Sequence, residues 1–332
     1  MINFLPDQCQ SAWQVSSNLK FPDSYSAVKN IVICAMGGSR FTPLTVKYLF
    51  PDKITLPYEI IDDYDLPAYV NENTLVILSS YSGATEEVLS CRDQALVKKA
   101  QITQVSSQSM LAVPGYIFNP DKFNPSRQPR MGNGFLLFGH LGLLQALKLI
   151  DLKETEVQSA IDFLRHNLPQ FQTQAEALAR DLKDTHLFII TSGFLRGFGN
   201  GFANQINENS KMISDPRVIP ELNHHLMEGL KFPNSLRQNA VFLFINSALY
   251  SPKIQLRFKI TQEIVTKQGI KTLNLNLAGP DKLSQVLEAY ALSGFLTLKL
   301  AEIYQVDPLA IPWVDYFKKE LGKQPAGSNP AG

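Results

Sequence analysis

Short apolar runs alternate with longer stretches of helical periodicity from Asn30 onward. In the first half, the β-rich runs lie at 31–35, 58–62, 74–79 and 102–106, and helical stretches occupy 42–50 and 84–99. Strands that alternate with helices form parallel sheets covered by helices, so this order predicts an α/β, doubly wound fold. A loop rich in Pro, Asn and Arg follows at 119–130, and the apolar stretch 135–150 after it predicts a buried helix.

The same order of elements begins again in the second half. An amphipathic stretch over 155–182 is followed by strand-like runs at 187–191, 241–246 and 272–277 and by helical stretches ending near 207 and covering 253–267, 283–305 and the residues after Pro312. This recurrence predicts a duplicated α/β unit. We expect two doubly wound parallel-sheet subdomains with flanking helices, residues 1–152 and 153–322, and a flexible tail, 323–332, that is rich in Gly and Pro.

Composition and charge are those of a globular protein of enzyme size. The 332 residues are 45% hydrophobic and 18% charged, which supports a large core and excludes disorder for most of the chain. The net charge is only +1, so a nucleic-acid partner is not expected. Cys9, Cys34 and Cys91 are widely spaced and odd in number, which predicts reduced thiols in a cytoplasmic protein. No long apolar stretch predicts a membrane span.

The turn after the first predicted strand contains two adjacent glycines. Gly37, Gly38 and Ser39 stand between that strand and a helix. Glycines let the backbone approach a ligand closely, and the N–H groups that open a helix favour an anion. A plain tight turn between strand and helix is the alternative interpretation.

The turn after the third predicted strand is rich in hydroxyl groups. Ser80, Ser82 and Thr85 lie within it, and hydroxyls together with helix-terminal N–H groups can hold a dianionic phosphate without a lysine. Both turns follow strands of one sheet, at the edge where open α/β folds bind ligands. We therefore expect a phosphate site there. Helix capping by Ser82 or Thr85 is the alternative.

These motifs, taken in order, resemble a known fold. The two turns, the segment 65–70 and the Pro129-Arg130 pair before an apolar helix are similar to the SIS, or sugar isomerase, fold and to its bifunctional phosphoglucose/phosphomannose isomerases. The resemblance runs from Asn30 to Lys319. It implies that the two turns hold the phosphate of a hexose 6-phosphate and that Arg130 supplies positive charge to a developing enediolate.

The segment 204–211 resembles the family segment that carries the catalytic base. Glu208 is the matching position. The resemblance implies that this carboxylate takes a proton from one of the sugar carbons C1 and C2 and returns it to the other. An ordinary exposed glutamate is the alternative.

The segment 221–229 carries two adjacent histidines. His224 matches the family histidine that opens the sugar ring, and His225 stands where the family usually has Asn, so the order of residues favours His224 as the one facing the site. In the family this histidine comes from the neighbouring subunit, which implies a homodimer with His224 contributed across the interface. A metal site formed with Glu228, or plain surface histidines, are the alternatives.

The segment 307–319 resembles the family's closing segment. Lys318 matches an active-site lysine that works beside the histidine at the ring oxygen, and Pro312 matches a proline. Ile311 replaces the family's threonine, which is linked to the use of mannose 6-phosphate. Isoleucine cannot hydrogen-bond, so the resemblance leaves the use of mannose 6-phosphate open. A solvated surface lysine is the alternative for Lys318.

The resemblance therefore implies an aldose–ketose isomerase of carbohydrate metabolism. Its reaction interconverts glucose 6-phosphate and fructose 6-phosphate through an enediolate, and this chemistry demands no metal, nucleotide or other cofactor. Neither a membrane nor a nucleic acid is expected as a partner. A non-catalytic SIS regulator that binds a sugar phosphate, and an isomerase of another sugar phosphate, are the alternative functions.

Overall fold

Two parallel sheets, one from each half of the chain, form the frame of the protein. The computed structural model describes residues 1–323, so the predicted tail lies outside the described residues from 324 onward. The first sheet has the order β2-β1-β3-β4-β5 and is built from β1 (Asn30–Ala35), β2 (Tyr58–Ile61), β3 (Thr74–Ser80), β4 (Gln101–Ser106) and β5 (Tyr116–Ile117). The second has the order β7-β6-β8-β9 and is built from β6 (His186–Ser192), β7 (Ser214–Ile219), β8 (Ala240–Ser247) and β9 (Lys271–Leu277).

Helices of very different lengths cover both sheets. The helices of eight residues or more are α1 (Leu5–Ser16), α2 (Gly37–Leu49), α3 (Glu86–Val97), α4 (Asn133–Ala146), α5 (Glu154–Leu182), α6 (Arg196–Gln205), α9 (Pro252–Lys267), α10 (Lys282–Tyr304) and α11 (Pro312–Leu321). The short ones are η1 (Ile2–Phe4), η2 (Asp23–Tyr25), η3 (Pro129–Met131), η4 (Gly193–Leu195), η6 (Glu221–His224), α7 (Leu226–Gly229), α8 (Leu236–Asn239) and a π-helical turn, η5 (Ile206–Ser210).

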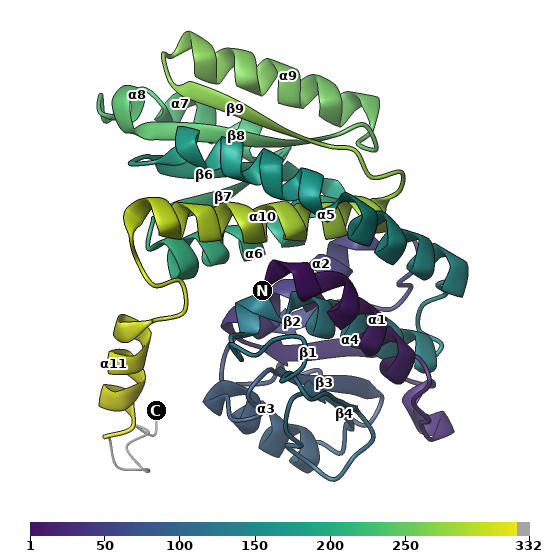
Figure 1. Cartoon of the computed structure of the whole chain (residues 1–332). Helices are drawn as coiled ribbons and strands as arrows, with labels where there is room; N and C mark the ends of the chain where they lie inside the picture. The colour runs from purple at the N-terminus through teal and green to yellow at the C-terminus, as the bar shows by residue number, and fades with distance from the viewer. Residues whose placement is uncertain (324–332) are drawn as a thin grey trace.

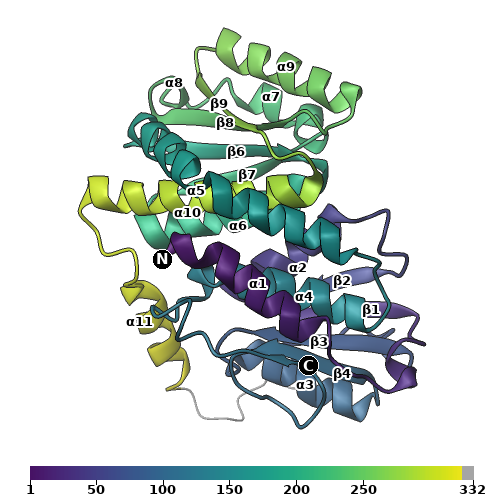
Figure 2. The same ribbon diagram turned by 45° about the vertical axis from the view of Figure 1, so that its right-hand side comes forward.

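The elements stack in layers, as Figure 1 shows. The second sheet lies at the top with α9 above it and α5, α6 and α10 below it. The helices α1, α2 and α4 come next, then the first sheet, with α3 beneath. Figure 2 gives the same order from another side and shows α11 standing beside the first half. The two sheets are therefore joined through two layers of helices, and one apolar core runs through these layers into both halves.

The two halves meet where α2 crosses α6, and small residues allow the close approach. A Cβ atom on Gly197 would lie 2.2 Å from the carbonyl oxygen of Leu44, and one on Gly201 would lie 3.1 Å from Cβ of Phe41. The hydroxyl groups of Thr45 and Tyr290 also lie 2.7 Å apart, linking α2 to α10. This contact fixes the end of α6 relative to the beginning of α2.

The fold confirms the predicted α/β class with two doubly wound parallel sheets. The strand order β2-β1-β3-β4 of the first sheet recurs as β7-β6-β8-β9 in the second, as expected for a duplicated unit. The pattern of apolar residues did not predict α1, β5 or β7. Strand β7 contains Pro216 and is only partly buried over most of its length, so it lacks the apolar run that marks its neighbours. A proline is tolerated there because β7 is an edge strand.

A buried histidine in α4 makes the stability of the fold depend on pH. His140 is inaccessible to solvent, its Nδ1 lies 2.6 Å from the carbonyl oxygen of Leu136, and its Nε2 has no partner in the described part of the chain. Burial lowers the pKa of His140 from the ordinary 6.5 to about 4. Between these two pH values His140 is protonated in the unfolded chain but neutral in the folded chain. The free energy of unfolding therefore decreases as the pH falls from 6.5 towards 4.

We expect this single group to remove up to about 3 kcal/mol of the free energy of unfolding over that range. Urea denaturation at a series of pH values measures it, and the variant His140→Leu should show a flatter dependence on pH. The exposed His166 provides the control, because His166→Gln should leave the slope unchanged. Equal slopes for His140→Leu and the unsubstituted protein would contradict the assignment.

Candidate active site

A fully buried arginine lies at the centre of the predicted site. Arg130, in η3, is 1% exposed. Its Nη1 donates to Oε2 of Glu208 at 2.8 Å and to Oε1 of Gln128 at 2.7 Å, and its Nε donates to Oδ1 of Asn209 at 2.6 Å. The structure therefore brings Arg130 and Glu208, separated by 78 residues in the sequence, into a direct ion pair.

The remaining N–H groups of Arg130 hold the chain near its C-terminal end. Nη2 donates to the carbonyl oxygens of Pro308 at 2.8 Å and Leu309 at 3.1 Å, in the segment between α10 and α11. A guanidinium has five N–H donors, and all five have an acceptor within the protein. A direct hydrogen bond from Arg130 to a bound molecule therefore requires that one of these acceptors be exchanged.

The two partners of the ion pair differ in exposure. The Glu208 side chain is 30% exposed, so its carboxylate is open to solvent while the guanidinium behind it is not. Burial lowers the pKa of Arg130, and the nearby Glu208 carboxylate opposes that shift. An arginine keeps its charge even so. The arrangement presents an oriented carboxyl group at the surface, backed by a buried positive charge.

Buried polar side chains fix the backbone of Arg130. Its carbonyl oxygen accepts from Nε2 of Gln205 at 3.1 Å and from Nδ2 of Asn133 at 3.0 Å. The Oε1 atom of Gln205 in turn accepts from the hydroxyl of Ser293 at 2.8 Å. Helices α4, α6 and α10 thus converge on one residue, which leaves Arg130 little freedom to move.

The glycine turn lies directly against Arg130. Gly37 has a φ of +46°, and a Cβ atom there would meet nothing within 4 Å. A Cβ atom on Gly38 would lie 2.7 Å from Cβ of Pro129 and 3.2 Å from the backbone nitrogen of Arg130. One glycine is therefore needed for its backbone conformation and faces open space, whereas the other is needed for close packing against η3.

The hydroxyl-rich turn is tied to the glycine turn. The hydroxyl of Ser39 accepts from the backbone N–H of Tyr81 at 2.8 Å, and the hydroxyl of Ser79 donates to the Ser39 carbonyl oxygen at 3.3 Å. The hydroxyls of Ser80 and Thr85 lie 2.7 Å apart. The structure thus brings the two predicted phosphate turns together at the carboxyl ends of β1 and β3.

Capping does not account for these hydroxyls. Thr85 stands at the N-cap position of α3, yet no side chain accepts a hydrogen bond there. Ser82 is exposed, and its hydroxyl accepts only a 3.3 Å bond from the N–H of Ala84. The first N–H groups of α3 remain without a side-chain cap, as an anion-binding turn requires.

His224 lies far from Glu208 in the same chain. Glu208 precedes β7 and His224 follows it, and a strand of six residues is roughly 17 Å long. His224 and His225 are exposed and make no side-chain hydrogen bond or ion pair with other residues among 1–323. The structure therefore does not bring either histidine into the site of its own chain.

Lys318 is likewise exposed, on a helix that buries none of its residues. Its ammonium has no hydrogen-bond or ion-pair partner in the described portion. Ile311, partly exposed, stands at the N-cap of α11, next to the segment that Arg130 holds. The structure brings Ile311 near the ion pair through this segment and leaves Lys318 pointing to solvent on the following helix.

Three residues of this site were not predicted from the sequence. Gln128 and Asn209 orient Arg130, and Lys211 donates to the carbonyl oxygens of Glu208 at 2.5 Å and Ala310 at 2.7 Å. The backbone carbonyls of 308–310 carry no signature in the sequence. For Lys211 the only signal is its position beside Glu208, which does not reveal its partner 99 residues away.

The described residues offer no metal centre, because residues 1–323 contain no group of three or more His, Cys, Asp or Glu side chains that could hold a metal ion. His224, His225 and Glu228 thus do not form such a group.

Over the described range, no helix is long and apolar enough to cross a membrane.

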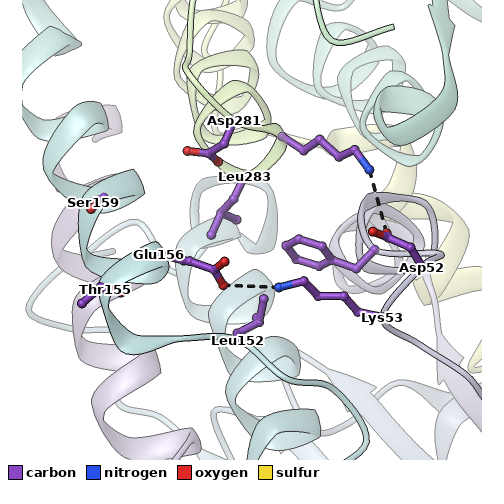
Figure 3. Close-up of a pocket in the computed structure, with 10 residues that line it drawn as sticks. Asp52, Lys53, Leu152, Thr155, Glu156, Ser159, Asp281 and Leu283 are labelled. Atoms are coloured by element: carbon purple, nitrogen blue, oxygen red, sulfur yellow. Dashed lines mark hydrogen bonds and ion pairs between the residues drawn. The ribbon is translucent and has the colours of Figure 1, made fainter. Parts of the chain in front are cut away.

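A cavity of about 470 Å³ lies elsewhere, where α5 and α10 begin (Figure 3). Ion pairs join Lys53 to Glu156 at 3.3 Å and Lys282 to Asp52 at 3.8 Å across it. None of the predicted site residues lines this cavity. The candidate active site is therefore the surface around Glu208 and the two turns, and this cavity is separate from it.

Comparisons with known proteins find phosphoglucose isomerases among the relatives of this chain. The model of the bacterial phospho-glucose isomerase C-terminal SIS domain matches residues 171–321. A bifunctional phosphoglucose/phosphomannose isomerase from Caldicellulosiruptor bescii is 27% identical over 96% of this chain and 97% of its own. The enzyme of the same name from Aquifex aeolicus is 27% identical over 89% of this chain and 91% of its own.

Solved structures share the fold at low sequence identity. The C-terminal domain of glucosamine-fructose-6-phosphate aminotransferase from Francisella tularensis has a TM-score of 0.70 and 14% identity, covering 92% of this chain and 95% of that one. Glucosamine-6-phosphate deaminase from Thermotoga maritima has a TM-score of 0.66 and 16% identity, covering 94% and 98%. At these identities the likeness concerns the SIS fold alone.

The contact between Gly38 and η3 can be tested by adding one methyl group. We expect Gly38→Ala to lower the free energy of unfolding by about 1–3 kcal/mol, because Pro129 is too rigid to yield. Affinity for inorganic phosphate should fall as well, since the turn shifts. Denaturation and calorimetry measure the two effects. Gly229→Ala is the control, because a Cβ atom there meets nothing within 4 Å; equal effects in the two variants would refute the packing argument.

Proposed function

Because this chain is related over most of its length to the bifunctional phosphoglucose/phosphomannose isomerases, we propose that it interconverts glucose 6-phosphate and fructose 6-phosphate. Mannose 6-phosphate is the second candidate aldose. The observation that carries this proposal is the ion pair between Arg130 and Glu208, which lies against the glycine turn. An oriented carboxylate beside an anion-binding turn is what an isomerase of a phosphorylated sugar needs.

We assign the phosphate to the two turns. Gly37, Gly38 and Ser39 form the first turn of α2, and the hydroxyls of Ser80, Ser82 and Thr85 lie in the turn that leads into α3. The two helix N-termini favour negative charge, and no lysine is required. Holding the phosphate, which does not react, fixes the sugar relative to the carboxylate.

Glu208 is assigned the proton transfer between C2 and C1. Its carboxyl group is partly exposed, and Arg130 holds Oε2, which leaves Oε1 without a hydrogen-bond partner among residues 1–323 and able to face the sugar. As the enediolate forms, the positive charge of Arg130 lies at the reacting end and offsets the negative charge that develops there. Arg130 acts on the enediolate through its charge alone, because all of its N–H groups already donate to acceptors within the protein.

Ring opening is assigned to His224 of a second copy of the chain. The strand β7 keeps His224 away from Glu208 within one chain, and His224 is fully available at the surface. The helix α11 also supports an assembly, because it buries none of its residues and exposes Trp313 and Phe317 by 82% and 62%. We therefore propose a homodimer in which His224 enters the partner's site.

Lys318 and Ile311 complete the assignment. Lys318 is carried by α11, the same helix whose apolar residues are exposed, so docking of that helix would bring the ammonium to the sugar ring. Ile311 has no hydrogen-bonding side chain, which favours glucose 6-phosphate over mannose 6-phosphate. Three free thiols, all buried, support a cytoplasmic location for the enzyme.

The function is tested by incubating the intact chain with glucose 6-phosphate and, separately, with mannose 6-phosphate, and by following fructose 6-phosphate. We expect turnover of glucose 6-phosphate without added metal. Glu208→Gln should lower kcat by a factor of about 10² to 10⁴, because the amide oxygen still accepts from Arg130 but cannot take a proton. In deuterated water, deuterium should enter C1 of the fructose 6-phosphate that forms, and C2 of the aldose in the reverse reaction.

The control variant is Glu263→Gln, on the exposed surface of α9, which should retain full activity. Failure to convert either aldose would contradict the proposed function. Undiminished activity of Glu208→Gln would remove this residue as the base.

The shared site is tested by mixing two inactive variants. Glu208→Gln and His224→Asn each remove one group, and a mixed dimer then contains one site with both groups intact if His224 acts across the interface. Random pairing should restore about a quarter of the unsubstituted activity. No recovery on mixing would show that His224 does not complete the partner's site. Repeating the experiment with His225→Asn tests the neighbouring imidazole.

A further inference from the structure

The segment between α10 and α11 is fastened to the turn that carries Glu208. Three successive carbonyl oxygens of this segment accept hydrogen bonds from cationic side chains. Arg130 donates to Pro308 and Leu309, and Lys211 donates to Ala310 at 2.7 Å. The Asp307 carboxylate accepts from the backbone N–H of Leu309 at 2.8 Å and folds the segment locally. We call residues 307–311 the linker.

Lys211 has an unusual backbone conformation that directs its side chain. Its φ and ψ are 57° and 25°, in the left-handed region, where a residue with a Cβ is disfavoured by roughly 1 kcal/mol or more. In this conformation it ends the π-helical turn, and its Nζ donates to the carbonyl oxygen of Glu208 at 2.5 Å as well as to that of Ala310. One ammonium group therefore joins the Glu208 turn to the linker.

The attachment points lie next to residues assigned to the reaction. Glu208 is the base in the proposed function, and Ala310 directly precedes Ile311. Pro312 then begins α11, so the helix that carries Lys318 starts two residues after the carbonyl that Lys211 holds. The helix has no buried residue of its own to fix its direction. Its position relative to Glu208 thus depends on how the linker is held.

We propose that Lys211 is a positioning residue that holds the linker against the Glu208 turn and so sets where α11 and Lys318 stand relative to the base. Lys211 contacts carbonyl oxygens only, and its role is exerted through the linker. Its catalytic consequence depends on the proposed function, whereas the fastening itself does not.

The fastening is tested by hydrogen exchange of the backbone amides in 305–312, which requires no catalysis. We expect Lys211→Met to speed this exchange about tenfold, since a hydrogen bond from a charged donor contributes at least that factor. Lys211→Gly removes the ammonium but also relieves the left-handed strain. Lys211→Gly should speed the exchange as well. This result would show that the effect comes from loss of the ammonium group and not from the left-handed backbone conformation.

Lys267→Met is the matched control, because Lys267 is an exposed lysine of α9 paired only with Glu263 in the described structure. Its linker exchange should equal that of the unsubstituted chain. Unchanged linker exchange in both Lys211 variants would overturn the proposal, and so would an effect of Lys211→Met that Lys211→Gly does not reproduce.

The catalytic consequence is tested by combining substitutions. We expect Lys211→Met to lower kcat for glucose 6-phosphate about tenfold and to leave KM nearly unchanged, because the phosphate turns are untouched. In a Lys318→Met background the same change should add little, since its effect passes through Lys318. A full additional loss in that background would contradict the positioning role. An unsubstituted chain without turnover would reject the proposed function, and the exchange experiment would still decide the fastening.

Discussion

The arrangement of the site depends on one buried charge. Arg130 is removed from water, and a charge in that position is tolerated only when its donors are satisfied. Its acceptors come from three parts of the chain: its own loop, the turn after α6, and the linker before α11. Satisfying the guanidinium therefore requires that both halves of the molecule and the C-terminal segment be in place together. The site and the fold are made by the same interactions.

The duplicated halves contribute to this site in different ways. In the first half, the turns at the carboxyl ends of β1 and β3, to which we assign the phosphate, are joined by a hydrogen bond, and α2 begins at one of them. The second half has the same strand order, but it supplies the end of α6 in place of its own turns. Because α2 packs on α6 through Gly197 and Gly201, the glycine turn that opens α2 and the turn η5 that carries Glu208 adjoin two helices in direct contact. The duplication thus places the turns assigned to the phosphate and the glutamate assigned to proton transfer together at the contact between α2 and α6.

Much of the fold could be predicted from the sequence because strands of a buried parallel sheet consist of continuous apolar residues. The strands β1, β3 and β8 are almost entirely buried and were recognised, whereas β7 escaped because it is a polar edge strand containing Pro216. Arg130 and Glu208 were identified through a family resemblance. Their pairing, and the roles of Gln128, Asn209 and Lys211, depend on contacts with residues up to 179 positions away and on backbone carbonyls. Such contacts leave no local pattern to read.

The near-zero net charge acquires a physical meaning from the ion pair. An anionic substrate would ordinarily call for exposed cations, yet the charge of Arg130 is largely balanced by Glu208 and screened from solvent. In the proposed function, the attraction for the phosphate comes from the N–H groups that begin α2 and α3, which are fixed dipoles that need no net charge. In the proposed function, Lys318 and His224 act beside Arg130 at the reacting end, and both are exposed in the single chain. In the proposed homodimer, these exposed side chains complete a site whose buried arginine already pairs with Glu208.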